Sequence, residues 1–188
     1  MFNFIISVFI NYLIYNNDYS NLYNCSFITF ASILKLLFFN NNITSKLLEL
    51  SLINSLLFYI IDTFILYNKI NIINNKNKIF ILHHISACEI IISKLIFGYN
   101  FYSFCLLIFL IESSSVFYNL YVNKFIKIKT YILSYVPLRI LSNIIFIYYI
   151  LYDNKYVNNI QLILDSITYT FLFIFNIAGV VYSLKKII

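Results

Sequence analysis

Apolar residues gather in seven runs that are separated by short polar segments. A run of about 20 apolar residues is long enough to cross the hydrocarbon core of a bilayer as an α-helix. The last five runs approach or exceed that length, whereas the first two are short and fit tilted spans, interfacial segments or a poorly delimited pair. The pattern therefore predicts an all-α helical bundle with about seven transmembrane helices, six at the least. The runs cover residues 1–15, 25–39, 47–67, 79–97, 101–122, 130–152 and 161–184.

The same pattern predicts one membrane domain, because no linker rich in Pro, Gly or Ser interrupts it. Within that domain we expect N-terminal membrane segments over residues 1–44 and a main transmembrane region over residues 45–188. Residues 1–15 have neither a basic start nor a small-residue cleavage site after them. We therefore expect a retained first helix rather than a cleaved signal peptide.

Composition agrees with a membrane protein: 62% of the residues are hydrophobic and 11% are charged, against about 25% charged in soluble domains. A soluble chain of this size leaves much of its area facing water, so this composition excludes a soluble globule. The net charge of +6 comes from lysines in short loops. Lysines placed in this way indicate membrane orientation, so we expect no nucleic-acid partner.

The lysines also predict which side of the membrane each loop occupies. If all seven runs span, eight lysines fall on one side and three on the other, with Lys35 ambiguous at a helix end. Because positive loops stay in the cytoplasm, we expect a cytoplasmic C-terminus and an N-terminus outside or in the lumen. The richer side holds Lys69, Lys76, Lys78, Lys124, Lys127, Lys129, Lys185 and Lys186, and the other holds Lys46, Lys94 and Lys155.

Ionisable residues inside the runs are candidates for function, because such groups are costly in lipid and normally face a bundle interior. Asp62 lies roughly 9 Å from the end of its run, and His83 and His84 lie roughly 6 to 8 Å into the next, at 1.5 Å per residue. These three residues therefore share one level on adjacent antiparallel helices. Helix-end groups satisfied by backbone, headgroups or interfacial water are the alternative interpretation.

Four other ionisable residues invite structural roles. Glu112 and Arg139 lie at roughly 15 and 13 Å depth, where a fork-shaped ion pair would satisfy both. Asp165 is near a helix start, where a carboxylate suits the positive end of the helix dipole. Glu89 is close enough to Lys94 for the two to satisfy each other, or for the lysine to snorkel.

Metal and cofactor chemistry is not expected. Cys25, Cys88 and Cys105 lie in or beside apolar runs without paired spacing, so we interpret them as ordinary buried thiols. His83 and His84 project about 100° apart on a helix, whereas metal-binding pairs on a helix use i, i+4 spacing.

In order along the chain, the polar motifs within residues 45–184 resemble those of the TLC superfamily of lipid-handling membrane proteins. That superfamily includes the ceramide synthases, the translocating-chain-associated membrane proteins and the ceroid lipofuscinosis membrane protein of the endoplasmic reticulum. The motifs are Tyr59 to Asp62 at the end of one span, His83-His84 opening the next, Glu112-Ser113 followed by Phe117 and Asn119, and then Arg139.

The resemblance implies an endoplasmic reticulum protein that acts in lipid sensing, transport or homeostasis, with membrane lipid as its partner. Assembly into a homo-oligomer is left open. The lining of the lipid cavity that it implies consists of Asp62, His83, His84, Glu112, Asn119 and Arg139.

Two rival functions remain open. In ceramide synthases the His pair lines an acyl-transfer site, but a segment with two Asp residues follows, where this chain has Ile111-Glu112-Ser113-Ser114-Ser115. This chain therefore resembles the small non-synthase members more closely. As an acyltransferase it would use acyl-CoA as a substrate, with His83 or His84 as the base and Asp62 holding the imidazole tautomer. The third function is trafficking or translocon association without a lipid substrate. The ending Lys185-Lys186-Ile187-Ile188 is similar to the dilysine retrieval signal of endoplasmic reticulum membrane proteins, with plain positive-inside anchoring as the alternative.

Overall fold

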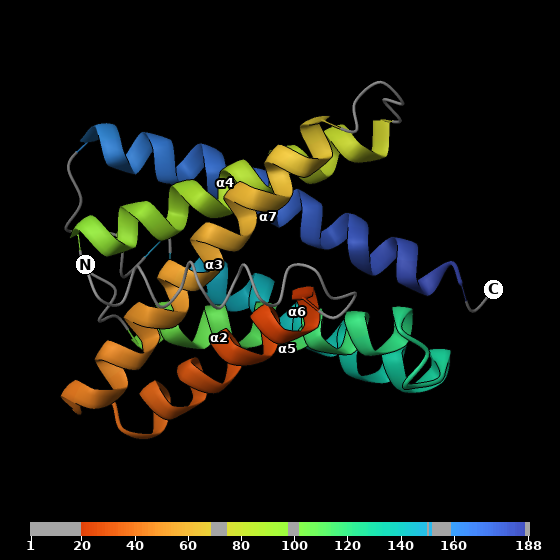
Figure 1. Cartoon of the computed structure of the whole chain (residues 1–188), viewed down its shortest axis with the longest axis horizontal. Helices are drawn as coiled ribbons and strands as arrows, with labels where there is room; N and C mark the ends of the chain where they lie inside the picture. The colour runs from red at the N-terminus through yellow and green to blue at the C-terminus, as the bar shows by residue number, and fades with distance from the viewer. Residues whose placement is uncertain (1–19, 69–74, 98–101, 150, 152–158, 187–188) are drawn as a thin grey trace.

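The described part of the chain is built from helices (Figure 1). The computed structural model describes residues 20–68, 75–97, 102–149, 151 and 159–186, so the predicted helix over residues 1–15 lies outside the described residues. The helices are α2 (Ser20–Leu37), α3 (Asn42–Asn68), α4 (Asn75–Phe97), α5 (Tyr102–Val122), α6 (Ile128–Tyr148) and α7 (Asn159–Leu184).

Each of these six helices coincides with one predicted apolar run, but several begin earlier than the run does. The largest differences are in α2 and α3, which both start five residues before their runs, α2 at Ser20. In α2 the early start is explained by packing. Its polar first turns are used in packing, because buried Asn24 accepts hydrogen bonds from Asn54 Nδ2 at 3.0 Å and from Ser55 Oγ at 3.1 Å, both on α3. The polar residues before residue 25, which the sequence pattern predicts to be a loop, therefore belong to a helix and form contacts between helices.

Five helices, α3 to α7, are long and apolar enough to cross a membrane. Their outward faces carry large apolar side chains such as Ile43 and Leu133, which are 75% and 77% exposed. A soluble monomer rarely exposes so much contiguous apolar surface, whereas lipid would cover it. An all-α bundle, with five helices apolar enough to span a membrane, is therefore confirmed for the described residues. The number of about seven spans stays a prediction, since α2 is not among the five.

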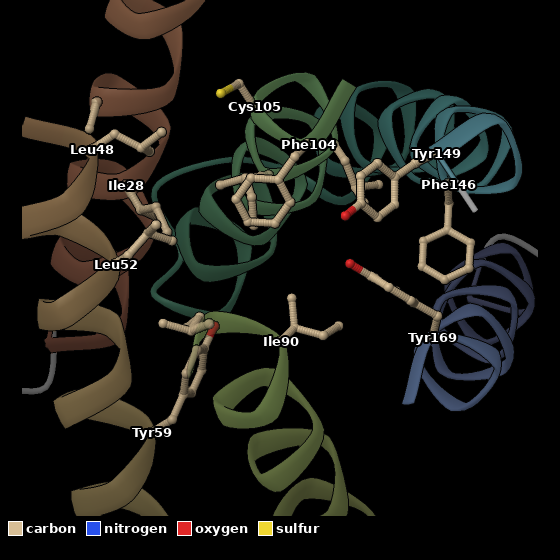
Figure 2. Packing of buried hydrophobic residues seen from close by; sticks show 14 of the residues in the cluster. Ile28, Leu48, Leu52, Tyr59, Ile90, Phe104, Cys105, Phe146, Tyr149 and Tyr169 are labelled. Atoms are coloured by element: carbon tan, nitrogen blue, oxygen red, sulfur yellow. The ribbon is translucent and has the colours of Figure 1, made fainter. Parts of the chain in front are cut away.

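The six helices close into a ring. Each makes its main contacts with two neighbours, in the order α2, α5, α6, α7, α4, α3 and back to α2. All six contribute to one buried apolar cluster in the ring, and Figure 2 shows Tyr149 and Tyr169 pointing toward each other across it. The cluster includes Ile28, Leu48, Leu52, Ile90, Phe104, Phe146, Tyr149 and Tyr169. A polar side chain on the inner face of any helix is thereby held away from lipid.

A tight turn joins α5 to α6 and sets these two helices side by side. The Phe125 N–H donates to Leu120 O at 2.9 Å and the Lys124 N–H donates to Tyr121 O at 3.0 Å, which is the hydrogen-bond pattern of a Schellman motif. Lys124 occupies the left-handed position, with φ of 63°. The turn brings the middle of α6 next to the Ser-rich segment of α5.

Candidate functional site

The structure brings Asp62 and His84 together where α3 packs against α4. Asp62 Oδ2 lies 3.4 Å from His84 Nδ1, and the two side chains are 29% and 9% exposed. The distance is that of an ion pair, although His84 Nδ1 makes no hydrogen bond within the described ranges. These two residues, which the sequence places at one level on adjacent helices, are therefore in contact.

Tyr59 connects the His pair to Glu112. It lies three residues before Asp62, hence on the same face of α3. Its ring centroid is 5.1 Å from that of His84 and 6.4 Å from that of His83. Its hydroxyl donates to Glu112 Oε1 of α5 at 3.3 Å. In the sequence Tyr59 stands out only as the start of a motif. In the structure its side chain joins α3 to α4 and α5.

The two histidines face different helices. His84 is directed to α3, whereas the His83 ring stacks on Phe175 of α7 with centroids 4.3 Å apart and an interplanar angle of 16°. Successive side chains on a helix point about 100° apart, so the two imidazoles have different closest partners, although the Tyr59 ring lies near both. Of the two, only His84 has a carboxylate partner among the residues that the structure describes.

The predicted ion pair between Glu112 and Arg139 does not form. Arg139 Nη1 donates to Asn176 Oδ1 of α7, and Nη2 donates to Ser115 Oγ of α5 at 3.1 Å. The guanidinium also lies 5.3 Å from the ring of Tyr135. The prediction was wrong because depth along a helix ignores direction around it: Glu112 is turned toward α3 and Arg139 toward α7. Asn176, which the sequence analysis did not single out, is the missing partner.

Four buried atoms at these contacts have no hydrogen-bond partner within the described ranges: Glu112 Oε2, Arg139 Nε, His83 Nδ1 and His84 Nδ1. A buried polar atom without a partner costs about 1 to 3 kcal/mol, and more if it carries charge. Such atoms are available to form a hydrogen bond with a polar group of a ligand or with water. One acceptor on a carboxyl group and one donor on a guanidinium therefore remain open inside the ring.

Asn119, the last predicted lining residue, is already satisfied. Its Oδ1 accepts from Asn21 Nδ2 at 3.1 Å, and its Nδ2 donates to Ser115 O at 2.8 Å. Through these bonds it joins the first turn of α2 to α5. Its described contacts are those of a residue that holds two helices together.

A second polar cluster lies between α4 and α7, and it corrects two predictions. Lys94 Nζ contacts Asp165 Oδ2 at 3.2 Å, and Ser93 Oγ donates to Asp165 Oδ1 at 3.1 Å. Asp165 does not cap its helix, because α7 already begins at Asn159. Lys94 neither snorkels nor pairs with Glu89, since it is 2% exposed and bound to Asp165.

Lys35, ambiguous in the sequence, also has its partners. Its ammonium donates to the carbonyl oxygen of Phe39 and to Ser45 Oγ, the latter at 2.7 Å. A lysine that binds a carbonyl just past the end of a helix stabilises that end. Lys35 therefore closes the turn between α2 and α3.

The cysteines fit the interpretation as ordinary thiols, with Cys25 and Cys105 buried and Cys88 half-buried. Within the part of the chain that the structure describes, no three His, Cys, Asp or Glu side chains are grouped to hold a metal ion.

The comparisons with known proteins add no relative. No protein-family model matches this chain, and neither a curated protein nor a solved structure matches it.

Proposed function

We propose that the chain is a multi-pass, TLC-like membrane protein of the endoplasmic reticulum that handles lipid, with a polar lipid group bound inside the helix ring. The observation that carries this proposal is the pair of unmatched groups, Glu112 and Arg139, each held by neutral partners rather than by the other. Ionisable groups within membrane spans normally serve function. A carboxyl and a guanidinium that do not neutralise each other suit a polar headgroup.

The finer features of topology belong to the same proposal. About seven spans, with the C-terminus in the cytoplasm, would place Asp62 and His84 toward the cytoplasmic leaflet, because the loop between α3 and α4 is on the lysine-rich side. A lipid entering from that leaflet would meet the His pair first and the Glu112 level deeper in. The ring would shield its polar part from the surrounding hydrocarbon.

An acyltransferase is the second candidate, and the contact between Asp62 and His84 favours it. A carboxylate beside an imidazole is a familiar way to hold a general base in one tautomer. In this reaction His84 takes the proton from an amine or hydroxyl as that group attacks the carbonyl carbon of an acyl-CoA. The new bond to nitrogen or oxygen forms, the bond from carbon to sulfur breaks, and CoA leaves as the thiol. His83, stacked on Phe175, would position the substrate.

The test is complementation of a deletion strain whose lipid profile is abnormal. We expect His84→Ala or His83→Ala to leave the profile as abnormal as the deletion does, while the protein accumulates to its usual level. Tyr131→Phe is the matched control, because it removes a buried hydrogen bond to Ser183 outside the site and should restore the profile.

A purified sample then separates the candidates. Turnover of acyl-CoA that is lost in His84→Ala supports the acyltransferase, whereas bound lipid without turnover supports lipid handling. If both His variants are stable and restore the lipid profile fully, the His pair is structural. Both the lipid site at the His pair and the acyltransferase are then contradicted. A defect in membrane-protein trafficking with normal lipids would favour the third function.

A further inference from the structure

The outer face of α7 carries a groove that is separate from the ring interior. It is an open, shallow hollow of about 440 Å³, and its lining side chains all come from this one helix and the residue that follows it. Figure 1 shows the C-terminal half of α7, in blue, running toward the end marked C. The groove is lined by Ile174, Ile177, Ala178, Val181, Tyr182 and Lys185.

The spacing of these residues explains the shape of the groove. They recur at intervals of three and four, so they share one face of the helix. Ala178 is exposed between larger neighbours, with Ile174 one turn before it and Tyr182 one turn after it. A methyl group between bulky side chains leaves a hollow along the helix axis.

The chemistry of the groove changes along its length. From Ile174 to Val181 the lining is apolar, and at the other end stands Lys185, just beyond the last residue of the span, Leu184. The distance from Ile174 to Lys185 is roughly 16 Å at 1.5 Å per residue, about half of a hydrocarbon core that is about 30 Å thick. This length fits the acyl chain of a lipid in one leaflet.

A second lysine and an aromatic residue support the charged end. Lys186 Nζ lies 4.8 Å from the ring centroid of Tyr182 and 5.0 Å from that of Tyr121 on α5. Tyr182 is thereby held between the groove and a fixed positive charge. Tyrosine and lysine at the end of a span are typical of the headgroup level of a bilayer, and basic residues there attract anionic lipids.

We propose that this groove binds one anionic phospholipid, with an acyl chain along Ile174 to Val181 and the phosphate on Lys185. The lipid is bound on the lipid-facing surface, so the site does not depend on the function proposed for the ring interior. Its role would be to recognise the lipid composition of one leaflet. The preference for an anionic headgroup comes from the lysine, and the hold on the chain comes from the notch at Ala178.

Native mass spectrometry of the full chain, released from vesicles with equal amounts of phosphatidylcholine and phosphatidylglycerol, tests the proposal. We expect one phosphatidylglycerol to be retained in preference. Lys185→Ala should lower that preference about fivefold, since one basic residue near a membrane surface contributes about 1 kcal/mol. Ala178→Phe should remove retention of both lipids by filling the notch.

Two exposed positions on α6, Lys129→Ala and Leu133→Phe, provide matched controls that should behave as the wild type. Circular dichroism of each variant establishes that its helices are intact, and Ala178→Leu replaces the phenylalanine variant if that variant does not fold. Unchanged retention in a folded Ala178 variant would overturn the proposal, as would equal retention of the two lipids by the wild type. A dimer that dissociates in the same variant would also overturn it, because the groove would then hold a second copy of the chain.

Discussion

Two polar clusters lie within the same ring of helices, and they differ in whether their buried charged groups pair with each other. Between α4 and α7, Lys94 and Asp165 neutralise each other at 3.2 Å and are 2% and 0% exposed. Near the middle of α5 and α6, Glu112 and Arg139 are bound by neutral groups on other helices and each keeps one buried atom without a partner among the described residues. We call Lys94 and Asp165 the closed pair, because each neutralises the other. We call Glu112 and Arg139 the open pair, because each could still bind a polar group of a ligand. Because Glu89 Oε2, beside Asp165, also has no hydrogen-bond partner among the described residues, the two clusters differ in charge pairing rather than in the presence of unsatisfied atoms.

Breaking the closed pair should have the largest effect. Asp165→Leu leaves the Lys94 ammonium without its counter-charge, and we expect a loss of about 3 to 5 kcal/mol in the free energy of unfolding, as for other broken buried pairs. Adding Lys94→Met should recover much of that loss. Reversible unfolding in detergent micelles measures both. A double variant no more stable than the single one would show that the pair does not act as a unit.

The open pair should behave differently in the same measurement. Arg139→Met removes hydrogen bonds to Asn176 and Ser115, and we expect a loss of about 1.5 to 3 kcal/mol, the range for hydrogen bonds to charged groups. Combined with Glu112→Gln, the coupling between the two effects should be smaller than that between Lys94 and Asp165, because no ion pair joins Glu112 to Arg139. A coupling as large as that between Lys94 and Asp165 would contradict the distinction drawn between the clusters.

Tyr59→Phe sharpens the comparison at the site itself. The ring contacts with both histidines remain, but Glu112 loses the donor to its Oε1. We expect about 1 to 3 kcal/mol of destabilisation, the cost of leaving a buried acceptor unsatisfied, together with a loss of lipid restoration in the deletion strain. Tyr131→Phe should destabilise comparably and still restore the lipids. Loss of restoration in both variants would indicate instability rather than a role in lipid binding.

Ser93→Ala is the mildest change and tests how closed the Lys94 pair is. It removes one hydrogen bond to Asp165, while Lys94 still contacts the other carboxylate oxygen. We expect a loss of about 1 kcal/mol, that of an ordinary hydrogen bond, without any change in lipid profile. An altered lipid profile in this variant would show that the cluster around Lys94 and Asp165 has a role in function and is not purely structural.

Much of the fold could be predicted from the sequence. The runs of apolar residues place all six described helices, because each span must satisfy its own backbone in lipid and must be long enough to cross it. Depth along the spans also brought Asp62 and His84 to one level, since these residues lie near the shared end of two consecutive helices. Short connections make such neighbours predictable.

The remaining partners were decided by the ring. Depth placed Glu112 and Arg139 at one level, but rotation about each helix axis, set by packing, turned one toward Tyr59 and the other toward Asn176. Asp165 looked like a cap until the start of α7 at Asn159 put it inside the bundle beside Lys94. The sequence by itself determined where the helices lie in the chain, that their outer surfaces suit lipid rather than water, and which ionisable residues are worth inspecting. Which of those residues meet was decided only by the tertiary structure, because contacts between helices distant in the chain depend on the direction in which each helix faces.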